Sequence, residues 1–395
     1  MYQDVWSLSW HFAIVRVLMS RAAKPIVVIA GQKPPPTGGQ NLMIASLLDD
    51  LRGDPRWLTE HLEFRFTSTF STVRRANLAK VWELLKVYGR LARIVFRYRR
   101  VDLVIYPSGG PQTVPLVRDI MLLPFVRIAT KRLWVQFHAA GIANRLKERK
   151  GILEALLKLV YRSVDGAIVM TEFNRCDPEL LGVKDVEVIP HRLKDENPQG
   201  ELPDYSKRPL RILHAGHLCS LKGTPQLLEA FGQLAHQFPD WHLVLMGEFL
   251  PPYSEKECLE RCRELGIQKR VEITGVLRGT EKASHFATAH LFVFASVAPY
   301  ESFGLVMAEA MMWGLPVLAS NWRGNHDVAG DSAVYFEVDL EIESKLAEKL
   351  QILLERPRAL RSIAKESRRR YVSEFCRDPE DINFVSRLIA SPSKP

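Results

Sequence analysis

Short runs of apolar, often β-branched residues recur along the chain, and they constrain its fold more than any other feature. Residues 24–31 form one such run, and a glycine-rich loop and a helical pattern that begins at Leu42 follow it. Runs without polar alternation are typical of strands in a parallel sheet that is covered on both faces. The same order of strand, loop and helix restarts at residues 211–216. We therefore predict an α/β protein with two Rossmann-like domains.

The predicted strands fall on either side of a polar stretch at residues 196–209. That stretch contains three prolines and no hydrophobic periodicity, which is typical of a linker between domains. We expect residues 1–23 to be an N-terminal extension, 24–195 the first domain, 210–371 the second domain and 372–395 a C-terminal segment. The strands are expected at residues 24–31, 63–67, 101–106, 133–137, 166–170, 186–190, 211–216, 241–246, 271–275, 289–296 and 315–320.

Residues 299–316 combine a glycine-marked helix with an isolated carboxylate. They predict a loop that enters a helix near Gly304 and a helix that ends at Gly314. Glu309 is the one charged side chain in this otherwise apolar helix. A buried carboxylate is strongly destabilising unless it is hydrogen-bonded. We therefore expect a nucleotide's ribose, rather than a permanent lysine or arginine of the protein, to be its partner.

A second carboxylate, Glu301, lies in the loop ahead of the same helix. Helix starts favour anions because their N–H groups are free and the positive end of the helix dipole lies there. Gly304 would let a ligand approach the backbone closely. This arrangement fits a sugar nucleotide, which has hydroxyls at both ends and a diphosphate between them.

The two glutamates are separated by seven residues, with Phe-Gly-Leu at 303–305 between them and Gly-Leu-Pro-Val at 314–317 after them. This pattern resembles the E-x7-E signature of retaining glycosyltransferases of family 4. The resemblance implies a GT-B fold, in which an acceptor-binding first domain and a nucleotide-sugar-binding second domain face each other across a cleft. It also implies a last helix that crosses back to the first domain. The implied activity is retaining transfer of a sugar from a UDP- or GDP-sugar to a glycan or lipid-linked acceptor, in polysaccharide or glycolipid synthesis.

The same resemblance assigns roles to residues elsewhere in the chain. The catalytic candidates are Glu301, Lys222 and His138. Lys222 matches the family's diphosphate site, and His138 matches the family's histidine at the end of a strand, which is a contact to the donor sugar. His217 stands where the family usually has arginine. The implied donor-binding residues are Gly38, Gly39, Gly216, His217, Lys222, Phe303, Gly304, Leu305 and Glu309.

The sequence has a formal net charge of +9 and a pI near 9.3, which favours anionic partners. Residues 77–97 predict an amphipathic helix with a basic side, which is either a solvated face or a contact for anionic lipid headgroups. No run of eighteen uninterrupted apolar residues predicts a membrane span. Residues 1–23 fit either an interfacial helix or a poorly ordered extension. Few cysteines and no signal peptide favour a cytoplasmic protein, and the basic helix leaves open whether the protein is also peripheral at the inner face of the membrane. The apolar side of the 77–97 helix is expected to contain Leu78, Val81, Trp82, Leu85, Tyr88, Leu91, Ala92 and Val95.

Three other function classes compete with glycosyl transfer. A carboxylate pair also serves glycoside hydrolases, but the apolar helix around Glu309 and the lack of a hydrolase motif disfavour that interpretation. A catalytically silent GT-B protein that binds nucleotide or membrane is the second. Nucleic-acid binding rests on net charge alone, and we expect no nucleic-acid partner. No Asp-x-Asp motif occurs, so we expect neither a metal nor another cofactor.

Overall fold

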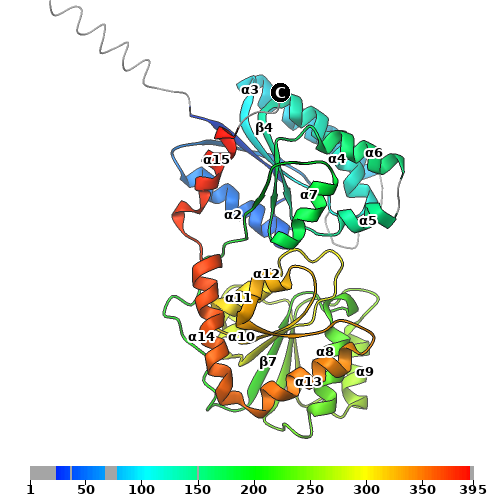
Figure 1. Cartoon of the computed structure of the whole chain (residues 1–395), viewed down its shortest axis with the longest axis vertical. Coiled ribbons are helices and arrows are strands. Elements are labelled where there is room, and N and C mark those ends of the chain that lie inside the picture. The colour runs from blue at the N-terminus through cyan, green and yellow to red at the C-terminus, as the bar shows by residue number, and fades with distance from the viewer. Residues whose placement is uncertain (1–23, 36–37, 67–77, 149–150, 392–395) are drawn as a thin grey trace, which may run out of the picture.

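A computed structural model describes residues 24–35, 38–66, 78–148 and 151–391. The twelve strands of this part of the chain form two six-stranded sheets, one above the other in Figure 1, and every strand pair is parallel. Helices flank both sheets. The prediction of two Rossmann-like α/β domains is confirmed. The predictions for residues 1–23 concern a segment outside the described residues.

The first sheet is built from residues before the predicted linker. Its order places β1 between β2 and β3, so the strand order reverses direction next to β1. Such reversals are where open α/β sheets bind ligands. Across the sheet the strands are β2 (Leu58–Glu63), β1 (Ile26–Gly31), β3 (Val101–Pro107), β4 (Thr130–Phe137), β5 (Gly166–Val169) and β6 (Val186–Val188).

The second sheet has the strand order of a dinucleotide-binding Rossmann domain, with its reversal between β7 and β10. The sequence patterns predicted all of its strands except β12, a short partly buried strand at the edge. Across the sheet the strands are β12 (Ala333–Phe336), β11 (Val317–Ser320), β10 (Leu291–Phe294), β7 (Leu210–Ala215), β8 (Trp241–Met246) and β9 (Val271–Gly275).

The α-helices of the first domain cover both faces of its sheet, and those of the second domain do the same. None of the helices in the described part of the chain is both long and apolar enough to cross a membrane. In order, the helices are α2 (Gly39–Gly53), α3 (Leu78–Tyr98), α4 (Thr113–Ala129), α5 (Ile142–Glu148), α6 (Ile152–Tyr161), α7 (Cys176–Leu180), α8 (Thr224–Leu234), α9 (Glu255–Glu264), α10 (Gly279–Thr288), α11 (Leu305–Met312), α12 (Asn325–Ala329), α13 (Ile342–Glu355), α14 (Leu360–Arg370) and α15 (Phe384–Ala390).

The chain crosses between the sheets twice, and the two crossings pair with each other. The backbone of Leu193 donates to Phe375 O at 2.8 Å and accepts from Arg377 N at 2.9 Å. After α14 a π-helical turn (Tyr371–Phe375) leads the chain back to the first domain, as Figure 1 shows. There α15 packs against β3 and β4. One hydrophobic core cluster therefore includes residues of both domains and of the returning segment.

The second strand lies earlier in the chain than predicted. Alternating aromatic residues favoured residues 63–67, but β2 ends at Glu63. It is an edge strand that pairs with β1 alone, so its half-exposed position tolerates a polar sequence. Phe64, which follows β2, is buried with its ring centroid 5.6 Å from that of Tyr106. The aromatic residues therefore cover the end of the sheet rather than extend it.

The long helix α3 was predicted with nearly correct ends, but only part of its predicted apolar side packs against the core. Its buried residues are Glu83, Leu84, Val87, Leu91 and Ile94. Of the apolar side predicted from the sequence, Leu91 is buried, whereas Leu78, Val81, Trp82 and Leu85 are exposed. The helix has two apolar stripes, and hydrophobic spacing alone did not show which one the sheet covers.

Candidate active site

The helix α11 begins directly after Gly304, which has a positive φ of 72°. A Cβ atom at this position would lie 2.9 Å from the ring of Phe294 at the end of β10. Glycine alone combines this backbone conformation with such a close contact. The helix ends at Met312, and Gly314 follows with a second positive φ. The predicted start and end of this helix are confirmed.

Glu301 and Lys222 form an ion pair inside the protein. The Lys222 Nζ lies 2.5 Å from Glu301 Oε2, and the Ser296 hydroxyl donates to the same oxygen at 2.7 Å. Burial would raise the pKa of Glu301, but the Lys222 ammonium and the Ser296 hydroxyl outweigh it and hold that pKa below its ordinary value. Burial would lower the pKa of Lys222, but the Glu301 carboxylate raises it. Both groups are therefore charged at neutral pH.

Lys222 is placed by the turn that starts α8. It ends a short 3-10 turn, and Gly223 follows with a φ of 74°. A side chain at Gly223 would collide with the carbonyl of Ala295 after β10, so the turn must pack against that loop without one. An ammonium beside a helix start opposes the helix dipole. The carboxylate of Glu301 offsets this conflict.

Gly216 and His217 follow β7, the strand that neighbours β10 at the reversal of the second sheet. His217 therefore enters the same group as Lys222 and Glu301. Burial and the Lys222 ammonium lower the pKa of His217, against the carboxylates of Glu248 and Glu301, which raise it. His217 is thus neutral at pH 7 and does not supply the permanent positive charge of an arginine.

Glu309 has a protein counter-ion, contrary to our expectation. Lys282 of α10 reaches it, with Nζ 2.5 Å from Oε1. The helical pattern of residues 305–312 could not show this partner, because packing brings α10 beside α11. The second oxygen, Oε2, is buried and has no hydrogen-bond partner among the described residues. Burial raises the pKa of Glu309, and Glu196 adds to this effect, although Lys282 lowers it. One carboxylate oxygen is therefore left to accept hydrogen bonds.

His138 follows β4 in the first domain, and the loop before α11 holds its backbone. The Ser302 hydroxyl donates to His138 O at 2.6 Å. Both ring nitrogens of His138 are buried, and neither has a hydrogen-bond partner among the residues that the structure describes. Burial lowers the pKa of His138 to about 3, so the ring is neutral. The neutral imidazole of His138 can donate one hydrogen bond and accept another, and it does neither with any of the described residues.

The loop before α11 joins the two domains through further backbone contacts. Ser302 O accepts from Asn174 Nδ2 at 2.8 Å and from Thr171 Oγ1 at 3.3 Å, and Tyr300 O accepts from Ala140 N at 3.2 Å. These three donors lie in the first domain, after β4 and β5.

The start of α2 lies beside the start of α11. A Cβ atom at Gly39 would lie 2.8 Å from Leu305 Cδ1, and Gly38 precedes the helix in extended conformation. Phe303 is buried between the two helix starts and the chain crossings. The predicted site residues of both domains thus converge where the domains meet.

Three residues that sequence reasoning missed contact predicted site residues, and a fourth, Asn174, binds the backbone of Ser302 between Glu301 and Phe303. Ser296 is the last residue of the predicted strand that leads to the signature, and this position was the one available signal. The others come from segments whose neighbours are set by tertiary packing. The four are Ser296, Lys282, Asn174 and His191.

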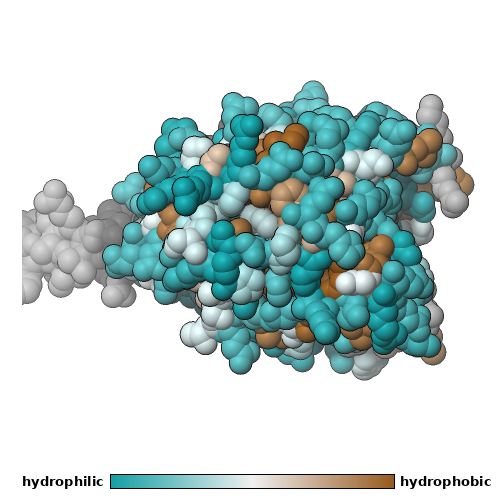
Figure 2. Space-filling model, turned by 90° about the horizontal axis from the view of Figure 1, so that it is seen from below, coloured by the Kyte–Doolittle hydropathy of each residue, from teal (hydrophilic) through white to brown (hydrophobic). Residues whose placement is uncertain are grey.

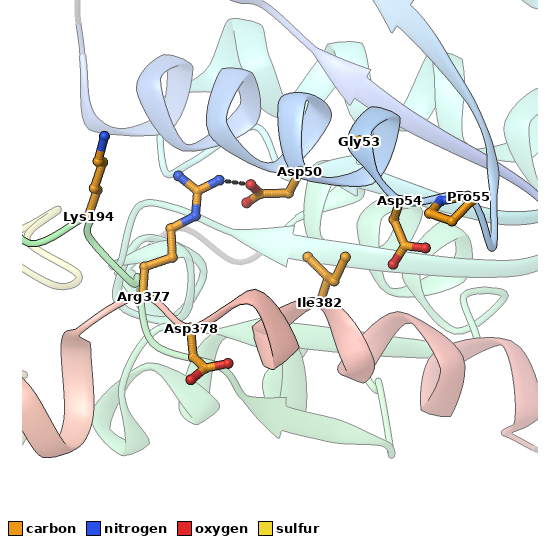
Figure 3. Close-up of a pocket in the computed structure, with 8 residues that line it drawn as sticks. All are labelled: Asp50, Gly53, Asp54, Pro55, Lys194, Arg377, Asp378 and Ile382. Carbon is orange, nitrogen blue, oxygen red and sulfur yellow. Dashed lines mark ion pairs between the residues drawn. The ribbon is translucent and has the colours of Figure 1, made fainter.

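A cavity of about 540 Å³ lies away from this group, between the C-terminal end of α2 and the crossing segments. Figure 3 shows the ion pair between Arg377 and Asp50 on one side of it. None of the predicted site residues lines this cavity. The lining residues are Asp50, Gly53, Asp54, Pro55, Lys194, Arg377, Asp378 and Ile382.

Comparison with known proteins finds a family match that covers most of the second domain. The family model described as glycosyl transferases group 1 matches residues 201–370. This segment contains Lys222, Glu301 and Glu309 but not His138.

Two curated glycosyltransferases resemble more than half of the chain. The uncharacterized glycosyltransferase YqgM of Bacillus subtilis is 28% identical over 213 residues, which are 53% of this chain and 57% of the relative. The phosphatidyl-myo-inositol mannosyltransferase of Mycobacterium leprae is 27% identical over 233 residues, 58% of this chain and 59% of the relative. The chain thus matches less than two thirds of either relative's length. These likenesses and the family match of residues 201–370 support an enzyme of the glycosyltransferase kind.

A solved structure extends the likeness of fold to both domains. The Anabaena protein Alr3699/HepE in complex with UDP superposes with a TM-score of 0.68 and 17% identity, over 93% of this chain and all of that one. Identity this low supports the fold alone. The GT-B arrangement expected from the resemblance is therefore confirmed as a fold.

Proposed function

We propose that this protein is a retaining glycosyltransferase that moves a sugar from a nucleoside-diphosphate sugar to a glycan or lipid-linked acceptor. The observation that carries this proposal is the group of Glu301, Lys222 and Glu309 around the starts of α8 and α11. It supplies a cation and free helix N–H groups for a diphosphate, and it supplies carboxylates for the hydroxyls on either side. A protein of the same fold is known in complex with UDP, which is a nucleoside diphosphate of the class proposed here.

Lys222 has the central role in this proposal. Departure of the nucleoside diphosphate places negative charge on the phosphate oxygens, and an oriented ammonium in a buried site stabilises that charge. Glu301 would turn from its pair with Lys222 to hydroxyls of the donor sugar, and the free oxygen of Glu309 would accept from the ribose hydroxyls. We also propose that the reaction needs no metal ion, because Lys222 and the helix starts supply the positive charge.

Release of nucleotide from a panel of UDP- and GDP-sugars tests the proposal. With a glycan or lipid-linked acceptor present, the wild-type protein should release UDP or GDP, and addition of EDTA should leave the rate unchanged. Lys222→Ala should lower the rate by about 10² to 10³-fold, the usual effect of losing one transition-state donor. Lys256→Ala, which removes an exposed lysine paired with Glu260 in the same domain, is the matched control.

The outcomes of this experiment distinguish glycosyl transfer from nucleotide binding without catalysis. If Lys222→Ala releases nucleotide as fast as wild type, the assignment of the site is wrong. If a nucleotide sugar raises the melting temperature of the wild-type protein but no nucleotide is released with any acceptor, the catalytically silent alternative holds instead.

We further propose that the protein contacts an anionic membrane surface through α3, α4 and α6. Of the 21 large hydrophobic side chains that are exposed in the described residues, twelve lie on these three helices. The helices are neighbours in the first domain, since α4 packs against both α3 and α6. By contrast, the end of the molecule seen from below in Figure 2 is mainly hydrophilic, with hydrophobic residues in small separate spots. The twelve residues, named here the apolar surface, are Leu78, Val81, Trp82, Leu85, Phe96, Val117, Met121, Phe125, Ile128, Ile152, Leu156 and Leu159.

Charge complementarity supports an anionic lipid surface as the partner. Lys86, Arg93 and Arg97 are exposed on α3, the helix that also presents Trp82. Each basic side chain near an anionic membrane contributes about 1 kcal/mol. A lipid-linked acceptor would be reached at such a surface, and the mannosyltransferase relative is named for phosphatidyl-myo-inositol.

A further inference from the structure

Four aromatic rings form a row that connects both domains. The rings of His138 and His191 are stacked, with centroids 5.6 Å apart and planes 13° from parallel. The ring centroid of Phe303 lies 5.2 Å from that of His191 and 5.3 Å from that of Phe375, and in each pair the two ring planes are nearly perpendicular. These residues come from the end of β4, the segment after β6, the loop before α11 and the π-helical turn.

His191 holds one side of the His138 ring. It is 8% exposed, so its own ring is fixed between His138 and Phe303. The backbone of His138 is held separately by the Ser302 hydroxyl. Stacking restrains the plane of the His138 ring but uses neither of its nitrogens. Both nitrogens are left without a hydrogen-bond partner among the described residues.

We propose that His191 is a positioning residue that orients His138 toward the donor sugar and keeps its imidazole neutral. This inference rests on the proposed function of His138 as a contact to the donor. Two imidazoles in parallel contact tolerate each other as neutral rings, whereas two positive rings at this distance would repel. The stack also excludes water from one face of His138, and desolvation disfavours the charged form.

The surroundings of His138 leave its protonation to burial and to His191. Among the described residues, His191 is the titratable side chain that faces the His138 ring, from the segment after β6. The loop before α11 contributes Phe303 and Ser302, which do not titrate near neutral pH, and its Glu301 is paired with Lys222. Burial and the neighbouring His138 also hold the pKa of His191 well below its ordinary value.

Two substitutions of His191 distinguish the effect of its stacking on His138 from any effect of hydrogen bonds made by its own imidazole. His191→Phe keeps an aromatic ring against His138, whereas His191→Ala removes it and admits water. In His191→Ala the pKa of His138 should return toward its ordinary value of about 6.5. Because a protonated ring can no longer accept a hydrogen bond, nucleotide release should then fall about tenfold between pH 7.5 and pH 5.5, relative to wild type at the same two pH values. His191→Phe should follow the wild-type pH profile.

A stacked histidine elsewhere provides the control. His326 lies 5.0 Å from the ring of Tyr335 in the second domain and is exposed, so His326→Ala should keep the wild-type pH profile. NMR titration of the His138 imidazole provides a readout that does not depend on turnover. It should show a neutral ring at pH 5.5 in wild type and in His191→Phe, and a protonated ring in His191→Ala.

The inference is overturned if His138 stays neutral at pH 5.5 in His191→Ala, or if His191→Phe gains the same acid loss of activity as His191→Ala. A wild-type protein that turns over no nucleotide sugar would instead count against the proposed function. The NMR titration would still decide whether His191 controls the protonation of His138.

Discussion

The two glutamates of the signature stretch have opposite electrostatic surroundings although both are largely buried. Glu301 has its pKa held below the ordinary value because Lys222 and Ser296 outweigh burial. Glu309 has its pKa raised because burial and Glu196 outweigh Lys282. Glu301 is therefore ionised throughout the neutral range, whereas the charge of Glu309 depends on Lys282. A ribose contact through Glu309 would accordingly be sensitive to acid.

Replacing Lys282 should make nucleotide binding more sensitive to acid. Lys282→Gln removes the one group that lowers the Glu309 pKa, so that pKa rises further above its ordinary value. The ionised carboxylate accepts from ribose hydroxyls, and affinity is lost as pH falls through its pKa. Titrations with UDP and with GDP across a pH series should therefore show this loss beginning at a higher pH in Lys282→Gln than in wild type.

An exposed lysine–glutamate pair in the same domain is the control for this experiment. Lys256→Gln breaks the pair with Glu260 on α9 and should keep the wild-type pH dependence. If Lys282→Gln and wild type lose affinity at the same pH, the ionised form of Glu309 does not contact the nucleotide.

At this scale the sequence predicted the groups that carry charge but not their partners. Glu309 was recognisable because it is the one charge in an apolar helix. Lys282 was not, because a lysine in an amphipathic helix usually faces solvent and nothing in α10 indicates that it packs against α11. His191 was not predicted either, because its stacking on His138 depends on how the crossing segment passes the first sheet.

At the scale of elements, α3 shows why hydrophobic spacing did not determine packing. The helix has one apolar stripe against the sheet and another on the surface, with basic residues between them. Either stripe satisfies a helical period, so the sequence predicted the helix but not its buried side. An exposed apolar stripe of this size is itself a functional indication, since soluble surfaces rarely gather large apolar side chains.

Substitution on the exposed stripe of α3 should weaken binding to vesicles without unfolding the protein. Wild type should co-sediment with phosphatidylcholine vesicles that contain phosphatidylserine, and less with phosphatidylcholine alone or in high salt. The double variant Trp82→Glu and Leu85→Glu should bind at least tenfold more weakly, because burial of one large apolar side chain contributes about 1.5–3 kcal/mol. Leu340→Glu alters a fully exposed leucine of the second domain and should bind as wild type does.

Two results would contradict a membrane contact through α3. One is a wild-type protein that stays in the supernatant with anionic vesicles. The other is a double variant that sediments with them as wild type does.

At the scale of the whole molecule, the predicted site forms where two sheet reversals face each other through the loops after β1, β4, β7 and β10. The sequence predicted this architecture because apolar strands and glycine turns report local structure. It could not predict how the domains are joined, because the contacts between crossings link residues far apart in the chain. Leu193 and Phe375, for example, are bonded through their backbones although 182 positions separate them, the difference between their numbers.

Arg368 of α14 fixes the first crossing to the second domain. Its guanidinium binds both oxygens of Asp195, at 3.0 and 2.6 Å, and donates to the carbonyls of Met312 and Asn197. Burial would raise the pKa of Asp195, but Arg368 and the backbone of Asn197 lower it. Both side chains of the pair are largely buried. Removing one partner of a buried pair leaves the other uncompensated, so Arg368→Ala should lower the free energy of unfolding by about 3 kcal/mol.

The neighbouring residue on the same helix tests whether burial is the cause. Arg369 is paired with Glu366 on the surface, so Arg369→Ala should lower the free energy of unfolding by about 0.5 kcal/mol or less. Urea unfolding followed by tryptophan fluorescence measures both changes at pH 7. Because the pKa of Asp195 is depressed in the folded protein, the contribution of its pair is present above the ordinary aspartate pKa and is lost as pH falls through the folded value. The difference between Arg368→Ala and wild type should therefore narrow in acid, and equal losses in the two arginine variants at pH 7 would show that the crossing is not held by this pair.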